Sequence, residues 1–215
     1  MAKDLSNYRK SYEKQELLES NCPGNPMELF QTWFRNADDS DTVEETNAMT
    51  ISTIGIDGFP KSRVVLLKKF TWEGFIFYTN YTSEKGKAIE NNNNICLSFF
   101  WPALEQQIII KGKAEKLAEN LSDGYFDSRP DGSKLGAWAS NQSTVVSSRE
   151  ELDKNLKMFE RSFDGKEIQR PPHWGGYLVK PKSIEFWQGR PNRMHDRIRY
   201  RLQEDFSWKL ERLAP

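Results

Sequence analysis

The chain has 215 residues, a length that suits one domain or one large barrel with helical additions. Lysine plus arginine equals aspartate plus glutamate at 31 each, so the chain lacks the net positive charge of a typical nucleic-acid-binding protein. Any site for an anion must therefore be local.

The cysteines and the apolar runs indicate the compartment. Cys22 and Cys96 have neither a CxxC partner nor a nearby histidine pair, which argues against a disulfide framework and against a zinc site. The apolar runs fall far short of the ~20 residues that a membrane span needs, and the first ten residues contain no apolar signal core. We therefore predict a soluble cytoplasmic protein without membrane partners.

The first part of the chain combines a polar arm with a helix. Residues 4–19 are polar with weak helical spacing, which predicts a loosely held amphipathic arm. The stretch 25–34 is a better helix, because Asn25 can cap it and Pro26 suits its first turn.

From Ala48 the apolar residues recur at every second position, which is typical of strands. We expect strands at 48–55, 61–70, 75–80, 95–101 and 106–117, with a short helix at 83–92 that Ser83 caps. A further helix is expected at 147–163, where Ser148 and Glu151 form a capping box, and strand character returns at 175–189, 197–203 and 207–215. The pattern predicts one mainly β domain over residues 1–215, an antiparallel barrel with peripheral helices, in which residues 1–20 form a mobile arm.

Arg63 and Lys68 bracket four apolar residues in "RVVLLK". On a regular strand the two side chains point to opposite faces, about 17 Å apart at ~3.3 Å per residue. If both bind anions, there must be two anionic groups. The alternative is that these charges at the strand ends simply reach solvent.

A second cluster of anion-binding residue types lies in "YFDSRPDGS", where Tyr125, Arg129 and Ser133 are four residues apart and Pro130 ends any helix. Two hydroxyls and a guanidinium can form a phosphate-binding site. The alternative is a helix end with ordinary surface residues.

His195 stands among arginines in "RPNRMHDRIRYR". Arginines repel a cation and His173 is isolated, so a metal is not expected. A Ser–His–Asp triad is poorly supported, because Asp196 is adjacent in sequence and on a strand would point the other way. With a period of two, Arg193, His195 and Arg197 share one face, which favours an anionic, electron-rich ligand. A solvated charged strand is the alternative, but it leaves the aromatics of "EFWQG" unexplained.

Several motifs together resemble one known family. The stretches "RVVLLK", "FYTNYTSEKGKAIENN", "YFDSRP", "GAWASNQS", "WGGYLV", "IEFWQG", "RMHDR" and the terminal "ERLAP" are similar to bacterial pyridoxine (pyridoxamine) 5′-phosphate oxidases, from about Tyr8 to Pro215. The resemblance implies an FMN-binding split β-barrel that acts as a homodimer with FMN bound between the chains. It also implies oxidation of pyridoxine or pyridoxamine 5′-phosphate to pyridoxal 5′-phosphate, with oxygen reduced to hydrogen peroxide.

The same resemblance implies roles for individual residues. Arg63 would contact the FMN phosphate, and Lys68 would contact the substrate phosphate. The cofactor contacts would be Arg63, Val64, Val65, Leu66, Leu67, Lys68, Tyr78, Thr79, Lys85, Gln107, Gln142, Ser143, Trp187 and Arg197. The substrate contacts would be Arg9, Tyr12, Lys68, Tyr125, Arg129, Ser133, Arg193 and His195, of which the last two, with Arg197, would act at the reacting ring.

The chain departs from the family at Glu84, where a basic residue is usual. A carboxylate facing the FMN phosphate should weaken cofactor binding by like charge. The alternative is that Glu84 turns outward and favours the helix dipole.

Two other functions stay open on the residues alone. One is a different flavoenzyme of the same fold, a reductase or a dehydrogenase; the phosphate-binding residues Tyr125, Arg129 and Ser133 argue against it. The other is a non-catalytic protein that binds flavin or pyridoxal phosphate, which "RMHDR" disfavours.

Overall fold

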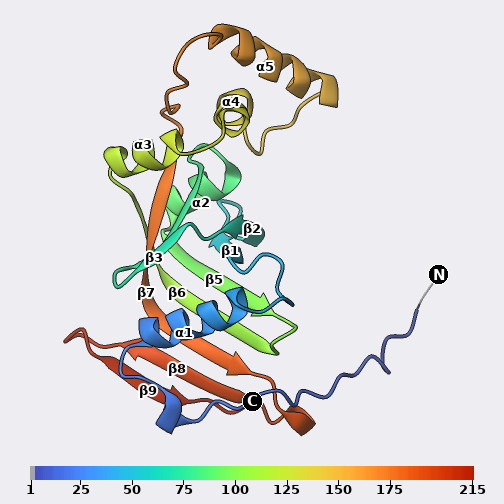
Figure 1. Ribbon diagram of the computed structural model, residues 1–215, viewed down its shortest axis with the longest axis vertical. Helices are drawn as coiled ribbons and strands as arrows, with labels where there is room; N and C mark the ends of the chain where they lie inside the picture. Colours follow the sequence, from blue (N-terminus) through green and yellow to red (C-terminus); the bar gives the residue numbers. More distant parts are fainter. Residues whose placement is uncertain (1–2) are drawn as a thin grey trace. The chain divides into compact units, whose positions relative to one another are not determined.

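The computed structural model of the chain describes residues 3–215 (Figure 1). Its α-helices are α1 (Pro26–Asp38), α2 (Glu84–Asn91), α3 (Glu119–Asp127), α4 (Asp131–Ala139) and α5 (Arg149–Ser162). Its strands are β1 (Ala48–Ile54), β2 (Pro60–Leu66), β3 (Lys69–Thr71), β4 (Gly74–Asn80), β5 (Asn94–Trp101), β6 (Gln106–Lys116), β7 (Trp174–Gln188), β8 (Asp196–Leu202) and β9 (Trp208–Arg212). Two short 3₁₀ helices are η1 (Glu19–Asn21) and η2 (Pro191–Arg193). The predicted class, mainly β with peripheral helices, is confirmed.

The chain forms two compact units. The first contains the described residues up to Met49, with Leu97–Lys111 and Pro181–Pro215; the second contains Thr50–Cys96 and Gly112–Lys180. Strands β1, β5, β6 and β7 contribute residues to both units. The single domain over 1–215 and the mobility of the arm stay predictions, and residues 1–2 of that arm lie outside the described residues.

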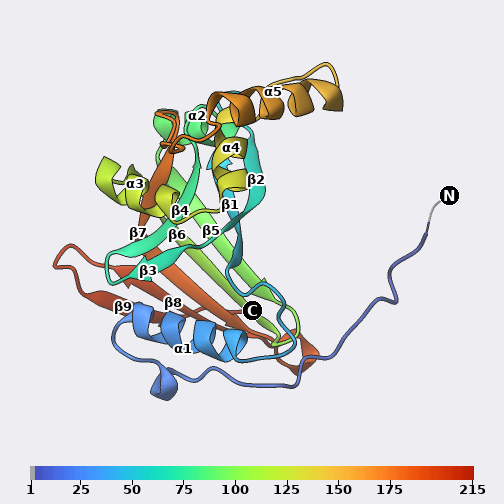
Figure 2. The same cartoon turned by 45° about the horizontal axis from the view of Figure 1, so that its top comes forward.

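In the first unit, α1 packs its apolar face on strands. Asn25 caps the helix by accepting the N–H of Met27, as predicted. The Phe30 ring lies 5.4 Å from Phe99 of β5, and Trp33 lies 5.2 Å from Phe186 of β7. Strand β8 pairs antiparallel with β7 and with β9, and Figures 1 and 2 both show α1 beside β8.

The strands form one nine-stranded sheet in the order β2-β1-β5-β6-β7-β4-β3, with β8 paired to β7 and β9. Strand β4 pairs antiparallel with β7 and places Thr79 opposite Gly175. Helix α2 follows β4 at once because Ser83 accepts the N–H of Gly86, as its predicted cap. Helices α4 and α5 lie side by side in Figures 1 and 2, with Trp138 of α4 5.7 Å from Phe159 of α5.

Two local predictions were wrong, and one helix was missed. The arm is not helical before Glu19, because polar contacts of its backbone hold it extended. The capping box is shifted by one residue: Glu151 accepts from Ser147, and the Ser148 side chain makes no capping hydrogen bond. Helix α4 was not predicted, although Pro130 directly before it suits a helix start.

The predicted strand 61–70 is also broken. It ends at Leu66, and β3 begins at Lys69. Leu67 is buried in the core, and the N–H of Lys68 donates to the carbonyl of Ile76 at 2.9 Å. The break ends the alternation of faces that the sequence predicted between Arg63 and Lys68.

The aromatic contacts of α1 give a stability test. Trp33→Ala should lower the free energy of unfolding by about 3–5 kcal/mol, because it opens a cavity in the core of the first unit. The neighbouring Thr32 is exposed, so Thr32→Ala should change stability by less than about 0.5 kcal/mol. Urea denaturation of both variants measures this, and equal losses would show that Trp33 does not anchor the helix.

Candidate functional site

A pocket in the second unit gathers positive charge. Its volume is about 820 Å³, and Arg63, Lys68, Lys85 and Arg129 line it without any aspartate or glutamate. We call it the cationic pocket. Arg63 pairs with Glu84, which lies outside the lining, and Lys68, Lys85 and Arg129 have no acidic partner among the described residues. Cations without such a partner are costly unless an anion neutralises them, so the pocket suits a ligand with anionic groups.

Most of the predicted cofactor and phosphate contacts line this pocket. Besides the four cations, they are Val64, Val65, Leu66, Tyr78, Thr79, Tyr125, Ser133, Gln142 and Ser143. Leu67 is the exception in "RVVLLK", because its side chain is buried in the core. Arg63 and Lys68 line the same pocket, so the predicted placement on opposite faces was wrong.

Sequence reasoning missed other lining residues. They are Asn80, Pro130, Gly136, Ala137, Ser140 and Trp174. All six lie in motifs that carried the family resemblance without a role for each residue, namely "FYTNYTSEKGKAIENN", "YFDSRP", "GAWASNQS" and "WGGYLV".

Arg129 is the clearest anion-binding group of the pocket. Its Nη1 is buried and makes no hydrogen bond among the described residues. Its guanidinium lies 4.6 Å from the centre of the Trp174 ring, which fixes its plane. Tyr125 stacks on Tyr78 at 3.9 Å and lines the same wall. A buried guanidinium donor without a partner fits a phosphate oxygen.

Lys85 is a second buried cation, on the first turn of α2. Its Nζ donates to Thr79 Oγ1 at 3.1 Å and to Gln142 Oε1 at 3.0 Å, both neutral groups. Burial, and then the charge of Arg63, lowers the pKa of Lys85 to about 8. An anion in the pocket would reverse this shift, because it favours the protonated amine.

Glu84 was predicted either to face the FMN phosphate or to turn outward, and neither position describes it fully. Its carboxylate pairs with Lys61 and accepts from Arg63 Nη2 at 2.8 Å, and it does not line the cationic pocket. The hydrogen bond from Lys61 holds the pKa of Glu84 below its usual range. Glu84 is therefore turned away from the pocket but bound to one of its cations.

A second pocket lies in the first unit, with a volume of about 750 Å³. We call it the arm pocket, because one wall is the arm segment Tyr8–Tyr12 and the other consists of Arg190, Asn192, Arg193 and His195. The predicted substrate residues Arg9, Tyr12, Arg193 and His195 thus line one pocket. Tyr8, Lys10, Ser11, Arg190 and Asn192 were not predicted.

The sequence predicted that one face of an extended segment carries Arg193, His195 and Arg197. This prediction was wrong. Asn192 and Arg193 have left-handed φ values of 56° and 60°, so the chain turns before β8 begins at Asp196. Arg197 lies on β8 opposite Trp187 and does not line the arm pocket.

The arginines around His195 are mostly paired. Arg190 and Arg212 pair with Asp196, Arg197 with Glu185, and Arg199 and Arg201 with Glu211. Arg193 is exposed and has no ion pair among residues 3–215. Its charge and that of Arg9, which also lines the arm pocket and has no ion pair among the described residues, are therefore available to a ligand.

His195 is held in a defined orientation. Its Nδ1 accepts the backbone N–H of Arg190 at 3.1 Å, and its ring lies 4.7 Å from Trp187. Burial, and then Arg193, keeps the pKa of His195 below its usual range, which favours the neutral ring. The proton of the neutral ring is then on Nε2, which can donate to a ligand.

Gln107 and Trp187 belong to the first unit and line neither pocket. Gln107 is half-buried on β6, and Trp187 on β7 lies 5.7 Å from Tyr12. The described residues contain no group of three acidic, histidine or cysteine side chains placed to hold a metal. None of their helices has the length and apolar character needed to cross a membrane.

Comparisons with known proteins agree with these features. Residues 39–161 match the family profile described as "Pyridoxamine 5'-phosphate oxidase", and residues 174–215 match "Pyridoxine 5'-phosphate oxidase C-terminal dimerisation region". A protein of Flavobacterium psychrophilum named pyridoxine/pyridoxamine 5′-phosphate oxidase is 69% identical over 99% of this chain and 100% of its own length. A protein of Christiangramia forsetii with the same name is 56% identical over the full length of both.

Among solved structures, PhzG from Burkholderia lata, in complex with tetrahydrophenazine-1-carboxylic acid, is similar with a TM-score of 0.85. It is 30% identical, and the match covers 93% of this chain and 98% of that one. This likeness confirms the predicted split-barrel fold. On the extent of these matches, the chain belongs to the pyridoxine/pyridoxamine 5′-phosphate oxidase family.

Proposed function

We propose that this protein is an FMN-dependent oxidase that converts pyridoxine 5′-phosphate or pyridoxamine 5′-phosphate to pyridoxal 5′-phosphate. The observation that carries the proposal is the cationic pocket: four cations, no acidic residue and a buried Arg129 donor without a partner. Such a pocket suits two phosphate groups, one from a cofactor and one from a substrate.

The residues of the pocket fit FMN. Arg63 and Lys85 would hold its phosphate, and Thr79, Gln142 and Ser143 would donate and accept hydrogen bonds around it. Bound FMN supplies the two-electron redox chemistry that no amino-acid side chain of the site offers. The chain's own residues bind it, orient the substrate and fix local charge.

The substrate phosphate would lie against Lys68, Tyr125, Arg129 and Ser133. Arg193 and His195 would contact the pyridine ring and its polar substituents, with the Nε2 proton of His195 as donor. Arg197, held by Glu185 and by the Ala214 carbonyl, would be a fixed cation near the flavin.

The reaction balances with oxygen as the acceptor. Pyridoxine 5′-phosphate loses two electrons and two protons from its 4′-alcohol, and oxygen takes them up as hydrogen peroxide. Pyridoxamine 5′-phosphate loses the same from its 4′-amine, and then takes up water and releases ammonia. A cytoplasmic location remains a prediction from the sequence.

We further propose a homodimer in which each site draws on both subunits. Trp187, Arg193, His195 and Arg197 all lie within residues 174–215, the segment that matches a dimerisation region. The cations of the cationic pocket lie outside that segment. A site that needs both sets is then complete only in the dimer.

An activity assay on the purified protein tests the function. The enzyme should be yellow and should form aldehyde and hydrogen peroxide from pyridoxamine 5′-phosphate. A yellow protein that reduces free flavin but leaves the substrate intact would indicate another flavoenzyme. Tight binding of flavin or pyridoxal phosphate without turnover would indicate a binding protein.

Replacement of Arg129 tests the assignment of the two anions. Arg129→Ala should raise the KM for pyridoxamine 5′-phosphate about 10- to 150-fold, the effect of losing a charge-assisted hydrogen bond worth roughly 1.5–3 kcal/mol. FMN content should stay near normal, and kcat/KM for unphosphorylated pyridoxamine should hardly change. Loss of FMN with unchanged KM would show that Arg129 holds the cofactor phosphate instead.

The pKa of Lys85 predicts the pH dependence of FMN binding. FMN phosphate binds the protonated amine better, so affinity is fully present below pH 8 and falls as the free protein loses this proton. The FMN dissociation constant should rise about ten-fold between pH 7 and pH 9, measured by fluorescence titration. Lys85→Arg keeps its proton and should flatten this rise; an equal rise in this variant would assign the pH dependence to another group.

Mixing two variants that bind the substrate weakly, assayed at a substrate concentration below the wild-type KM, tests the shared site. Arg129→Ala changes the cationic pocket, and Arg193→Ala changes the arm pocket. If each site combines these residues from different subunits, every mixed dimer contains one intact site, and random exchange should restore about one quarter of wild-type activity. No recovery, with exchange verified by mass spectrometry, would place both residues of a site on one chain.

A further inference from the structure

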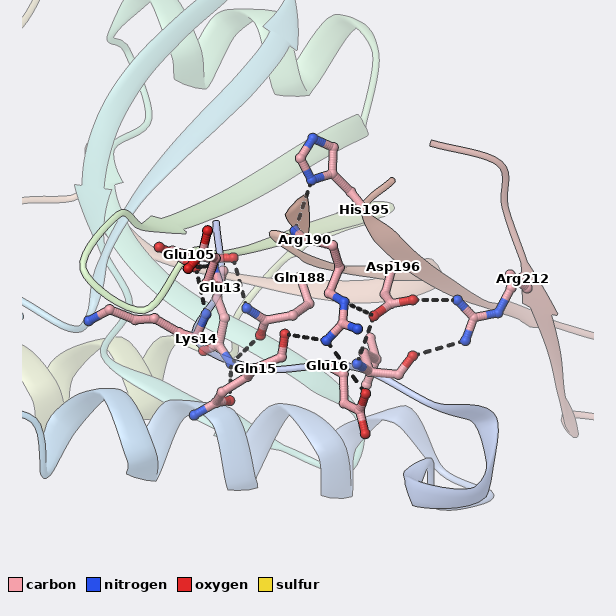
Figure 3. Close-up of polar contacts among 12 residues, drawn as sticks. Glu13, Lys14, Gln15, Glu16, Glu105, Gln188, Arg190, His195, Asp196 and Arg212 are labelled. Atoms are coloured by element: carbon pink, nitrogen blue, oxygen red, sulfur yellow. Dashed lines mark hydrogen bonds and ion pairs between the residues drawn. The ribbon is translucent and has the colours of Figure 1, made fainter. Parts of the chain in front are cut away.

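Glu105 is a buried carboxylate whose partners all belong to the N-terminal arm. The residue lies in the turn between β5 and β6 and is 2% exposed. Its Oε2 accepts the backbone N–H of Glu13 at 2.8 Å and of Lys14 at 3.1 Å (Figure 3). Its Oε1 lies 3.5 Å from Lys10 Nζ. Among the described residues, its side chain has no other hydrogen bond or ion pair.

The backbone of Glu105 is in a conformation that glutamate disfavours. Its φ is 58°, in the left-handed region that glycine and asparagine adopt more easily. The turn itself is fixed by the backbone, since the Glu105 carbonyl accepts the N–H of Gly189 at 2.8 Å. A glutamate here is therefore explained by its side chain and not by the turn.

A second carboxylate holds the next part of the arm. Asp196 accepts the N–H of Leu17 at 3.1 Å and pairs with Arg212 at 2.7 Å. Arg212 also donates to the Leu17 carbonyl, and Arg190 donates to the Gln15 carbonyl at 3.2 Å (Figure 3). The arm is thus held through its main chain from residue 13 to residue 17.

This attachment decides where Tyr12 lies. Its ring is 5.8 Å from the His195 ring and 5.7 Å from Trp187. It also packs on Gly189, where an added Cβ would come within 2.7 Å of Tyr12 Cγ. Because Tyr8–Tyr12 form one wall of the arm pocket, the bonds at residues 13 and 14 set whether that wall stands against Arg193 and His195.

We propose that Glu105 is a positioning residue that holds the arm closed over the arm pocket and so controls how tightly the substrate is bound. Its carboxylate touches no residue assigned to the substrate and acts through the main chain at Glu13 and Lys14. When the arm leaves, the carboxylate loses its two charge-assisted hydrogen bonds from Glu13 and Lys14, and this loss opposes opening. We call this attachment of the arm by Glu105 the latch. The identity of the bound substrate rests on the proposed function, whereas the latch does not.

The test compares the FMN-loaded wild type with Glu105→Gln. Amide hydrogen exchange at Glu13 and Lys14, measured without substrate, should be about ten-fold faster in the variant, because neutral acceptors bind backbone N–H groups more weakly than a carboxylate does. Trypsin should cleave after Lys10 and Lys14 sooner. The KM for pyridoxamine 5′-phosphate should rise several-fold, while kcat changes less than two-fold.

Two further variants separate the latch from general stability and charge. Glu105→Gly suits the left-handed turn, so it should release the arm equally while leaving the melting temperature unchanged or higher. Glu16→Gln removes the same charge from an exposed arm residue that lies 3.5 Å from Arg190, and it should change neither exchange nor KM.

Unchanged exchange at residues 13 and 14 in both Glu105 variants would overturn the latch. Faster exchange with an unchanged KM would overturn its control of substrate binding. A wild-type protein that protects these amides but does not oxidise pyridoxamine 5′-phosphate would refute the proposed function and leave the latch in place.

Discussion

Positive charge in a pocket that no acidic residue lines is the constraint on which the rest of the site depends. Arg63, Lys68, Lys85 and Arg129 face a cavity that no carboxylate lines, although the chain as a whole is neutral. The fold tolerates this because Lys85 is solvated by neutral oxygens and Arg129 is supported by the face of Trp174. A ligand with phosphate groups supplies the missing negative charge, so the free energy of binding comes from charges already in place.

In contrast to the cations of that pocket, most arginines near His195 are paired with acidic residues. Acidic partners neutralise those on β8, and the pairs fix β8, β9 and the arm. Arg193 alone of the "RMHDR" pair lacks such a partner among residues 3–215, because the left-handed turn at Asn192 and Arg193 turns it out of the strand ladder. The path of the backbone thus separates the paired arginines of β8, which stabilise the structure, from Arg193, whose charge is free to bind a ligand.

The sequence was informative where a local rule decides the structure. Period-two strands and the caps at Asn25 and Ser83 predicted the class and most elements, and the family motifs predicted most of the cationic pocket. The break of the strand at Leu67 could not be predicted, because "VVLL" is uniformly apolar and only the packing shows which of these residues enters the core. The turn at Arg193 was not predicted, because arginine rarely adopts a positive φ. Glu105 gave no signal, since its partners lie about 90 residues away along the chain.

The attachment of the arm through backbone N–H groups has a consequence for how its sequence can vary. Every residue type except proline carries the donor that Glu105 binds at positions 13 and 14. Substitutions at these two positions can therefore change the charge and polarity of the arm without changing its path. Selection on this contact falls on Glu105 itself and on the exclusion of proline, so a conserved arm geometry is compatible with a poorly conserved arm sequence.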